Sequence, residues 1–230
     1  PSPSTGTAAS SSTPLVSVLV LTCNRNSYAR LAVQLIGMQT YENLEIILVD
    51  DGAESLGPIF SGEHPNLPMT IVRAAGAAGA ATIGAKRNMA VHAARGDYLI
   101  HWDDDDMYAP DRIARQIAPL ISGEGAISVL KNSFAAAVSA DHVNYYHASK
   151  DSMMLASLAY TRGAFDAARG FQNISLGEDL AFVDSALLAC RRLVEVREHD
   201  LPWPQKASRG LPWPSLAFHG LPWPSMAFSR

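Results

Sequence analysis

The chain has 230 residues, 48% of them hydrophobic and 17% charged, which is enough apolar material for one sizeable globular core. Its formal net charge of −4, without any run rich in Lys and Arg, argues against a nucleic-acid partner. No apolar stretch approaches the roughly 20 residues that a membrane-spanning helix needs.

The amino-terminal segment, residues 1–14, is rich in Ser, Thr, Ala and Pro, and we expect it to be disordered. It shows neither the basic start nor the apolar core of a signal peptide. The two cysteines, Cys23 and Cys190, lie in apolar stretches and are expected to be buried thiols rather than a disulfide. These features favour a cytoplasmic protein, and a peripheral membrane contact stays open.

The first half of the chain alternates between short apolar runs and helical segments. We expect Ser27 to cap the first helix and Pro110 to open the third. This alternation predicts an α/β fold, with a mostly parallel sheet that is flanked by helices. The predicted strands are residues 16–22, 44–49, 69–73 and 97–102, and the predicted helices are residues 28–38, 82–94 and 110–120.

The second half is less regular. Apolar residues at helical spacing predict a helix over 178–190, whereas residues 153–160 fit either a strand or a helix. Further strands are predicted at residues 126–130, 134–138, 143–146 and 192–198.

The last 30 residues contain a ten-residue repeat, Leu-Pro-Trp-Pro, which begins at Leu201, Leu211 and Leu221. Proline on both sides of each tryptophan excludes a helix and favours an extended or polyproline conformation. Three interpretations stay open for this tail, residues 201–230. It packs over the apolar surface of the domain, it mediates self-association, or it contacts a membrane interface.

Four consecutive aspartates, Asp103 to Asp106, directly follow an apolar strand. Each carboxylate disfavours ionisation of its neighbours, so such a run needs a counter-charge. A hard divalent cation such as Mg²⁺, Mn²⁺ or Ca²⁺ is the natural partner for oxygen ligands. The alternative is a plain acidic loop on the surface.

A second pair of acids, Asp50 and Asp51, ends the strand predicted at residues 44–49. In open α/β sheets the ligand lies beyond the carboxyl ends of the strands. We therefore expect the two acid clusters to converge on one crevice.

Five motifs occur in order along the chain, at residues 16–25, 45–52, 85–88, 96–106 and 177–179. Together they resemble one family, the nucleotide-sugar-dependent glycosyltransferases of GT-A fold, specifically the inverting family 2 type. The resemblance implies a Rossmann-like GT-A domain over residues 15–200 with a short acceptor-side half. It also implies metal-dependent, inverting transfer of a sugar from a nucleoside-diphosphate sugar, with a UDP-sugar favoured, to a hydroxyl of a glycan, lipid or protein.

By this resemblance the Asp-x-Asp motif of the family corresponds to Asp103, Asp104 and Asp105. It implies that Asp105 ligates Mn²⁺ or Mg²⁺, with Asp103 beside it and Asp104 near the ribose or the waters on the metal. Asp106 has a supporting or solvent-facing role. A later histidine sometimes completes the family's metal site, and His199 is the candidate, with His147 as another.

The resemblance also assigns the nucleotide. Asp51 corresponds to the position that accepts a hydrogen bond from the base, typically uracil; the alternative is an ordinary turn aspartate. The loop with Thr22 and Cys23 corresponds to the loop around the nucleotide. Cys23 stands where the family often has an aromatic residue, and a thiol does not stack on a base as a ring does.

Three cations are candidates for contact with the diphosphate, namely Arg25, Lys86 and Arg87. A solvated surface role is the alternative for each. A Walker-type phosphate loop is excluded, because Arg87 rather than Ser or Thr follows Lys86.

Transfer also needs a base that takes the proton of the acceptor hydroxyl. The resemblance assigns this role to Asp179, with Glu178 in support. Acids at the start of a helix are also favoured by the helix dipole alone, which is the alternative for both residues. Two further functions stay open. One is a non-catalytic nucleotide-sugar-binding or interaction module of the same fold, and the other is a metal-dependent nucleotidyltransferase.

Overall fold

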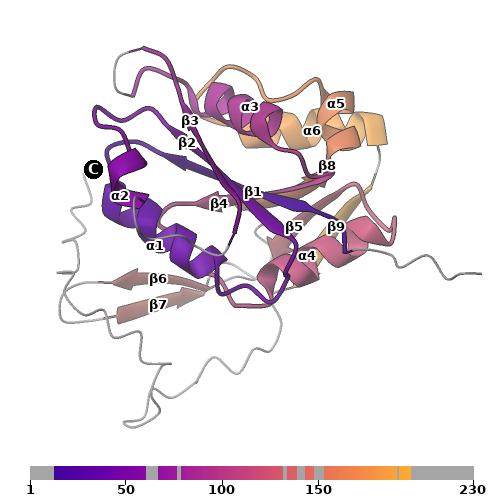
Figure 1. Cartoon of the computed structure of the whole chain (residues 1–230). Coiled ribbons are helices and arrows are strands. Elements are labelled where there is room, and N and C mark those ends of the chain that lie inside the picture. The colour runs from indigo at the N-terminus through magenta and orange to yellow at the C-terminus, as the bar shows by residue number, and fades with distance from the viewer. Residues whose placement is uncertain are drawn as a thin grey trace, which may run out of the picture.

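Figure 1 shows a computed structural model of the chain, which describes residues 13–60, 67–76, 79–131, 134–138, 143–147, 153–190 and 192–197. The predictions for residues 1–12 and for the repeat tail at 201–230 thus lie outside the described residues. Within the described ranges, no helix combines the length and the apolar character needed to cross a membrane.

The core of the molecule is a seven-stranded sheet with the strand order β3-β2-β1-β4-β8-β5-β9. A separate antiparallel pair is formed by β6 (Phe134–Val138) and β7 (Val143–His147). The strands of the main sheet are β1 (Val16–Thr22), β2 (Leu44–Asp50), β3 (Met69–Arg73), β4 (Tyr98–Asp103), β5 (Ile127–Lys131), β8 (Met153–Thr161) and β9 (Leu193–Arg197).

The sheet is mostly parallel, as the sequence predicts. β1 pairs in parallel with β2 and β4, β2 pairs in parallel with β3, and β5 pairs in parallel with β9. Only β8, among the described strands of this sheet, is antiparallel to both of its neighbours, β4 and β5. The described chain between β5 and β8 contains no crossover helix, which a parallel connection would need.

Helices cover both faces of this sheet (Figure 1). One layer holds α3, α5 and α6, and the opposite layer holds α1 and α4, with the short α2 beside α1. Their bounds are α1 (Asn26–Ile36), α2 (Gly57–Phe60), α3 (Ile83–Ala93), α4 (Arg112–Ile121), α5 (Arg162–Ala168) and α6 (Glu178–Cys190).

The two helical layers explain why the central strands read as continuous apolar runs. Successive strand residues point to opposite faces of a sheet. In β2, Ile46 and Leu48 join the core under α1 and α4, whereas Ile47 and Val49 join the core under α3, α5 and α6. Both faces of β2 are therefore buried, as in other parallel sheets.

Several predicted boundaries and caps differ from the structure. The first helix begins at Asn26 with Arg25 at the N-cap position and no side-chain cap, so the prediction that Ser27 caps it is wrong. α4 begins at Arg112, two positions after the predicted Pro110, because Asp111 holds the N-cap position. The undecided segment is the strand β8, and the sequence did not predict α2 or α5. Cys23 and Cys190 are free, as expected, but only half buried.

Candidate functional site

The predicted convergence of the acids occurs at the carboxyl ends of β1, β2 and β4. Thr22 at the end of β1 lies opposite Asp50 in β2, and its neighbour Leu21 lies opposite Asp103 in β4. The hydroxyl of Thr22 donates a hydrogen bond of 2.7 Å to Oδ2 of Asp104. The chain continues from β1 to β2 on one side and later places β4 on the other, so this point is the topological switch of the sheet.

The four aspartates have different environments in the turn after β4. Asp104 is buried at 3% exposure, whereas the side chain of Asp105 is 46% exposed. Asp106 accepts a 2.6 Å hydrogen bond from the hydroxyl of Tyr108, and its carbonyl accepts one from the indole of the buried Trp102. Asp106 thus holds the turn, which agrees with a supporting role.

Three carboxyl groups of this turn have raised pKa values, which means that their ionised forms are disfavoured. Burial raises the pKa of Asp103 to about 6; Arg87 opposes this increase and the neighbouring carboxylates add to it. Burial also raises the pKa of Asp104, against the hydrogen bond from Thr22 and the charge of Arg25. The same cause raises the pKa of Asp106, against the hydrogen bond from Tyr108. A cation beside these groups would relieve that cost.

Arg25 already supplies part of this positive charge. Its Nη1 atom lies 2.9 Å from Oδ1 of Asp104, and its Nη2 atom lies 2.6 Å from Oδ2 of Asp105. The guanidinium also lies over the ring of Tyr28, 4.6 Å from the ring centroid. The sequence predicts that Arg25 contacts the diphosphate, whereas in the structure its guanidinium pairs with the aspartates of this turn.

The carboxylates of this turn fit a hard divalent cation by their chemistry, because they supply only oxygen donors. No group of three or more His, Cys, Asp or Glu side chains suited to a metal occurs among the described residues. This donor set suits Mg²⁺ or Mn²⁺ held by one or two carboxylates, with the remaining positions left to water and substrate phosphate. His199 lies outside the described residues, and the side chain of His147 in β7 is not described.

Asp51 provides an unused acceptor beside the acids. Its Oδ1 atom lies 2.9 Å from Nζ of Lys86, whereas its Oδ2 atom is buried without a hydrogen-bond partner in the described chain. Lys86 is itself buried at 8% exposure, so the structure turns this lysine inward to Asp51. A buried acceptor without a partner is costly, and a donor group of a ligand would satisfy it.

Both carboxylate oxygens of the neighbouring Asp50 already have partners within the protein. Its Oδ1 atom accepts a hydrogen bond from the backbone of Gly52, and its Oδ2 atom pairs with Arg73 at 2.5 Å. Cys23 lies close by, with its thiol 3.7 Å from the carbonyl oxygen of Asp51. Burial, followed by Asp51, raises the pKa of this thiol, so Cys23 is a neutral group beside the unused acceptor.

The predicted base and its neighbour open α6. Glu178 is buried and pairs with Arg87, whose Nη2 atom lies 3.2 Å from Oε1 of Glu178. Asp179 is half buried, and its Oδ1 atom accepts a hydrogen bond from the backbone of Leu180. Arg87, like Lys86, is therefore directed into the protein.

The sequence did not assign a role to His101, a partner of Arg87, or to Tyr160, which bonds to His101. His101 of β4 contacts Arg87 through Nδ1 and lies 3.0 Å from the hydroxyl of Tyr160 through Nε2. Burial, followed by the charges of Arg87 and Arg112, holds the pKa of His101 well below its usual value. The sequence shows only that a histidine, His101, precedes the aspartates. The pairing of β4 with β8 is needed to show that Tyr160 lies beside His101.

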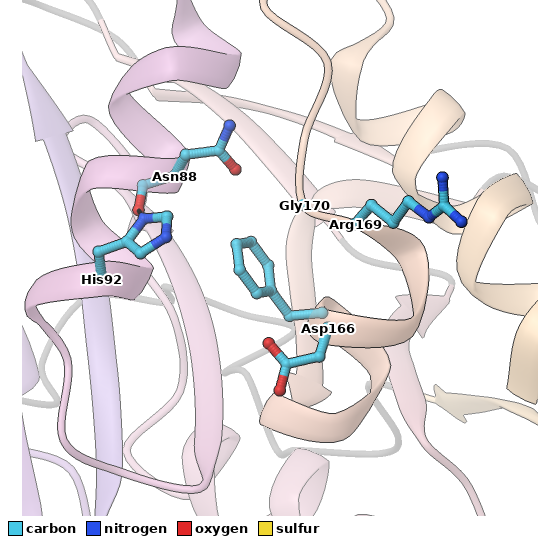
Figure 2. Close-up of a pocket in the computed structure, with 6 residues that line it drawn as sticks. Asn88, His92, Asp166, Arg169 and Gly170 are labelled. Carbon is cyan, nitrogen blue, oxygen red and sulfur yellow. Dashed lines mark hydrogen bonds between the residues drawn. The ribbon is translucent and has the colours of Figure 1, made fainter.

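A pocket of 270 Å³ lies between α3 and the end of α5 (Figure 2). Asn88 and His92 reach it from α3, and Asp166 and Arg169 reach it from α5 and the residue after it. Asn88 holds the backbone of Phe171 with two hydrogen bonds of 2.9 Å. None of the predicted site residues lines this pocket, so it is separate from the acids at the ends of β2 and β4.

A sequence model described as glycosyl transferase family 2 matches residues 17–135, which is more than half of the chain. The chain belongs to glycosyl transferase family 2. The matched segment runs from β1 into β6 and contains Asp51 and the Asp103–Asp106 run, but it ends before α6.

Curated relatives agree with this family. The chain is 33% identical over 101 residues to "Putative glycosyltransferase EpsH" of Bacillus subtilis, which covers 43% of this chain and 28% of the relative. It is 31% identical over 103 residues to "Putative colanic acid biosynthesis glycosyl transferase WcaA" of Escherichia coli, covering 44% of this chain and 36% of the relative. The matched region thus spans less than a third of EpsH and little more than a third of WcaA.

Solved structures share the fold at low sequence identity. TarS 1–349 of S. aureus superposes with a TM-score of 0.62 at 17% identity, covering 80% of this chain and 58% of TarS 1–349. The mannosyltransferase PcManGT of Pyrobaculum calidifontis, in complex with GDP-Man and Mn²⁺, gives a TM-score of 0.60 at 18% identity, covering 82% and 57%. The sheet and its flanking helices are therefore those of the GT-A fold.

Proposed function

We propose that this chain transfers a sugar from a nucleoside-diphosphate sugar to an acceptor hydroxyl, with a divalent cation and with inversion at the sugar carbon. The observation that carries the proposal is the meeting of Asp51 and the Asp103–Asp106 run at the ends of β1, β2 and β4. A base acceptor and a cation site then lie in one crevice of a family 2 domain.

The nucleotide is proposed to bind with its base at Asp51. The free Oδ2 atom of Asp51 accepts an N–H of the base, while Lys86 holds the carboxylate through Oδ1. A UDP-sugar is favoured, because uracil offers such a donor and because TarS 1–349 has been solved in complex with UDP and with UDP-GlcNAc. Thr22 and Cys23 lie along the same edge, and Arg25 is the exposed cation nearest the acids.

The cation is proposed to be Mn²⁺ or Mg²⁺ and to be held by Asp105 with Asp103 beside it. Asp105 is the exposed member of the run, and Asp104 already bonds to Thr22 and Arg25. When bound, such a cation neutralises the charge that develops on the departing diphosphate. The complex of PcManGT with GDP-Man and Mn²⁺ supports a divalent ion in this fold.

The acceptor hydroxyl is proposed to lose its proton to Asp179. The acceptor oxygen forms its bond to the sugar carbon as the bond from that carbon to the diphosphate oxygen breaks, and the proton moves to the carboxylate. One displacement without a covalent intermediate inverts the configuration at the sugar carbon. Asp179 suits this role because it opens α6, is half exposed and keeps one carboxylate oxygen outside its local hydrogen bond.

A screen of nucleotide sugars tests this function. The full chain is incubated with UDP-, GDP- and TDP-sugars, with Mn²⁺, Mg²⁺ or EDTA, and thermal stabilisation and nucleoside diphosphate release are measured. We expect a UDP-sugar with Mn²⁺ to raise the melting temperature and to release UDP. Release of pyrophosphate would instead indicate a nucleotidyltransferase, and metal-dependent binding without hydrolysis or transfer to any acceptor would indicate a binding module.

The domain limits and the tail remain part of the proposal. We assign the activity to residues 15–200 and self-association to the Leu-Pro-Trp-Pro repeats at 201–230, and we leave the acceptor as a glycan, lipid or protein hydroxyl. Deletion of residues 201–230 separates the roles. Loss of assembly in gel filtration with retained UDP release supports the division, whereas loss of UDP release contradicts it.

A further inference from the structure

We propose that Arg87 is a positioning residue that fixes the first turn of α6, and with it Asp179, against the strand that carries the aspartates. This inference rests on the proposed function and deepens it. Arg87 was a candidate for phosphate contact from the sequence, but its side chain is only 7% exposed and points into the protein.

The contact with α6 is a buried ion pair. Nη2 of Arg87 lies 3.2 Å from Oε1 of Glu178, and the Glu178 side chain is 5% exposed. Glu178 directly precedes Asp179 in the first turn of the helix. When one partner of a buried pair is removed, the other charge is left without compensation, so the pair strongly favours one arrangement of the two elements.

The other side of the same guanidinium contacts β4. Nη1 of Arg87 lies against Nδ1 of His101, two residues before Asp103 in that strand. A guanidinium only donates hydrogen bonds, so Nδ1 of His101 accepts and the ring proton is on Nε2. That proton is donated to the hydroxyl of Tyr160 in β8, 3.0 Å away. Arg87 is thus connected directly to β4 and, through His101, to β8.

The segment that precedes α6 packs against helix α3. Asn88 holds the backbone of Phe171, and the backbone of Gly84 donates to the carbonyl of Ile174 at 3.0 Å. A Cβ atom on Gly84 would lie 1.8 Å from the carbonyl oxygen of Gln172, so the loop approaches α3 as closely as a glycine permits. Arg87 continues this contact to the first turn of α6.

The Asp179 side chain has few contacts of its own in the described structure. Residues 172–176 are exposed, and Gly177 turns the chain with φ of +78° just before the helix. The Asp179 carboxylate accepts a hydrogen bond from the backbone of the next residue, Leu180. The buried Phe182 and Val183 anchor α6 in the core, and in its first turn the Glu178–Arg87 pair adds a fixed contact directly beside Asp179.

The guanidinium of Arg87 joins the two elements that carry the proposed cation and base residues. It contacts His101 in β4, two residues before Asp103, and its ion pair holds Glu178 in α6. Arg87 therefore lies between the carboxylates proposed for the cation and the turn proposed for the base. Loss of Arg87 should displace the base while Asp51, which we assign to the nucleotide, keeps its own partner Lys86.

Kinetics of four variants test the inference: Arg87→Met, Arg87→Lys, Glu178→Gln and the double change Arg87→Met with Glu178→Gln. We expect each single change except Arg87→Lys to lower kcat at least ten-fold, with KM for the donor and Kd for UDP–Mn²⁺ within about two-fold. The double variant should lose less than the product of the single losses, because it leaves no unpaired charge. Arg87→Lys should retain more activity than Arg87→Met.

Arg95→Met is the matched control. It removes another arginine that pairs with a buried glutamate, Glu45 in β2 rather than a residue of α6, and should lower stability without changing kcat. A rise in Kd for UDP–Mn²⁺ in Arg87→Met with kcat preserved would show a phosphate contact and overturn the inference, as would strictly additive losses.

Hydrogen exchange separates this inference from the proposed function. We expect faster exchange at the amides of Ala181 and Phe182, in the first turns of α6, in Glu178→Gln and Arg87→Met than in the unmodified chain. This measurement needs no turnover, so an inactive wild type would contradict the proposed function alone. Unchanged exchange in both variants would overturn the positioning role.

Discussion

Arg25 places its guanidinium 2.9 Å from the buried carboxylate of Asp104, where a cation would otherwise balance the acids. The same side chain reaches Asp105 at 2.6 Å, and it is 42% exposed. Arg25 therefore competes for the carboxylate that we assign to the metal. Exposed ion pairs are weak, so this competition should be modest.

Replacing Arg25 should tighten the binding of metal alone and weaken the binding of nucleotide. In Arg25→Met we expect about three-fold tighter Mn²⁺ binding without nucleotide, because the acids lose their internal cation. UDP–Mn²⁺ should bind more weakly, because an exposed cation that we propose to face the diphosphate is gone. Electron paramagnetic resonance titration of free Mn²⁺ and calorimetry with UDP measure the two effects.

Arg192→Met is the control for net charge, because Arg192 is exposed and bonds to the carbonyl of Gly123 away from the acids. Weaker binding of Mn²⁺ alone to Arg25→Met than to the unmodified chain would contradict this competition.

Asp105→Ala should abolish metal-dependent donor binding. Asp105 is the exposed carboxylate of the run, so its loss removes the ligand assigned to the cation without opening a buried cavity. Calorimetry with UDP and Mn²⁺ measures the loss, and an unchanged affinity would refute the metal assignment. Asp97→Ala removes an exposed acid just before β4, at the end of the strand remote from the turn, and should leave the affinity unchanged.

Substitutions of Asp51 and Asp50 should have different effects, the first on UDP affinity and the second on the melting temperature. Asp51→Asn keeps the size of the side chain but replaces one acceptor with a donor. We therefore expect UDP affinity to fall ~10-fold or more, because a mismatched buried donor costs its full desolvation. Asp50→Asn should lower the melting temperature through loss of the Arg73 pair, with UDP affinity retained. Equal effects of the two changes on UDP affinity would contradict the assignment.

The strands and the meeting of the acids follow from the sequence, because β1, β2 and β4 are buried on both faces and read as continuous apolar runs. The carboxyl ends of neighbouring parallel strands share an edge, so the approach of Asp51 to Asp103–Asp106 is a consequence of topology. The nine-residue β8 was ambiguous, because a short apolar run fits either period.

The inward direction of Lys86 and Arg87 could not be predicted. These two adjacent cations on α3 pair with Asp51 of the β2 end and Glu178 of α6, which lie far from them in sequence. A cation in sequence is normally assigned to solvent or ligand, because burial of its charge needs a partner. Only the packing of α3 on the sheet and beside α6 supplies those partners.

Asp179→Asn should spare donor binding and stop transfer. The amide cannot take a proton, whereas the size of the side chain and the Leu180 contact are kept. General bases contribute about 10²- to 10⁴-fold, so we expect a loss of kcat in that range with unchanged Kd for UDP–Mn²⁺. Steady-state rates with a saturating UDP-sugar and acceptor measure it. Rates equal to those of the unmodified chain would remove Asp179 from the mechanism.

Glu45 should make the fold less stable in acid. Its buried carboxylate at the start of β2 accepts hydrogen bonds from Ser17 at 2.6 Å and from the backbone and side chain of Arg95 at 2.6 Å and 2.8 Å. Burial alone would raise the pKa of Glu45, but these bonds outweigh it and lower the pKa below the usual glutamate value. The folded state therefore binds this proton less readily than the unfolded state does.

The stability that Glu45 contributes is thus fully present above the usual glutamate pKa and is lost as the pH falls through the lowered one. Glu45→Gln should cost about 2 kcal/mol at neutral pH, as expected for hydrogen bonds to a charged group, and less as the pH drops through that window. Denaturant unfolding of both chains between neutral and acidic pH measures the difference. A difference that stays constant, or that grows toward acid, would show that the charge of Glu45 does not stabilise the fold.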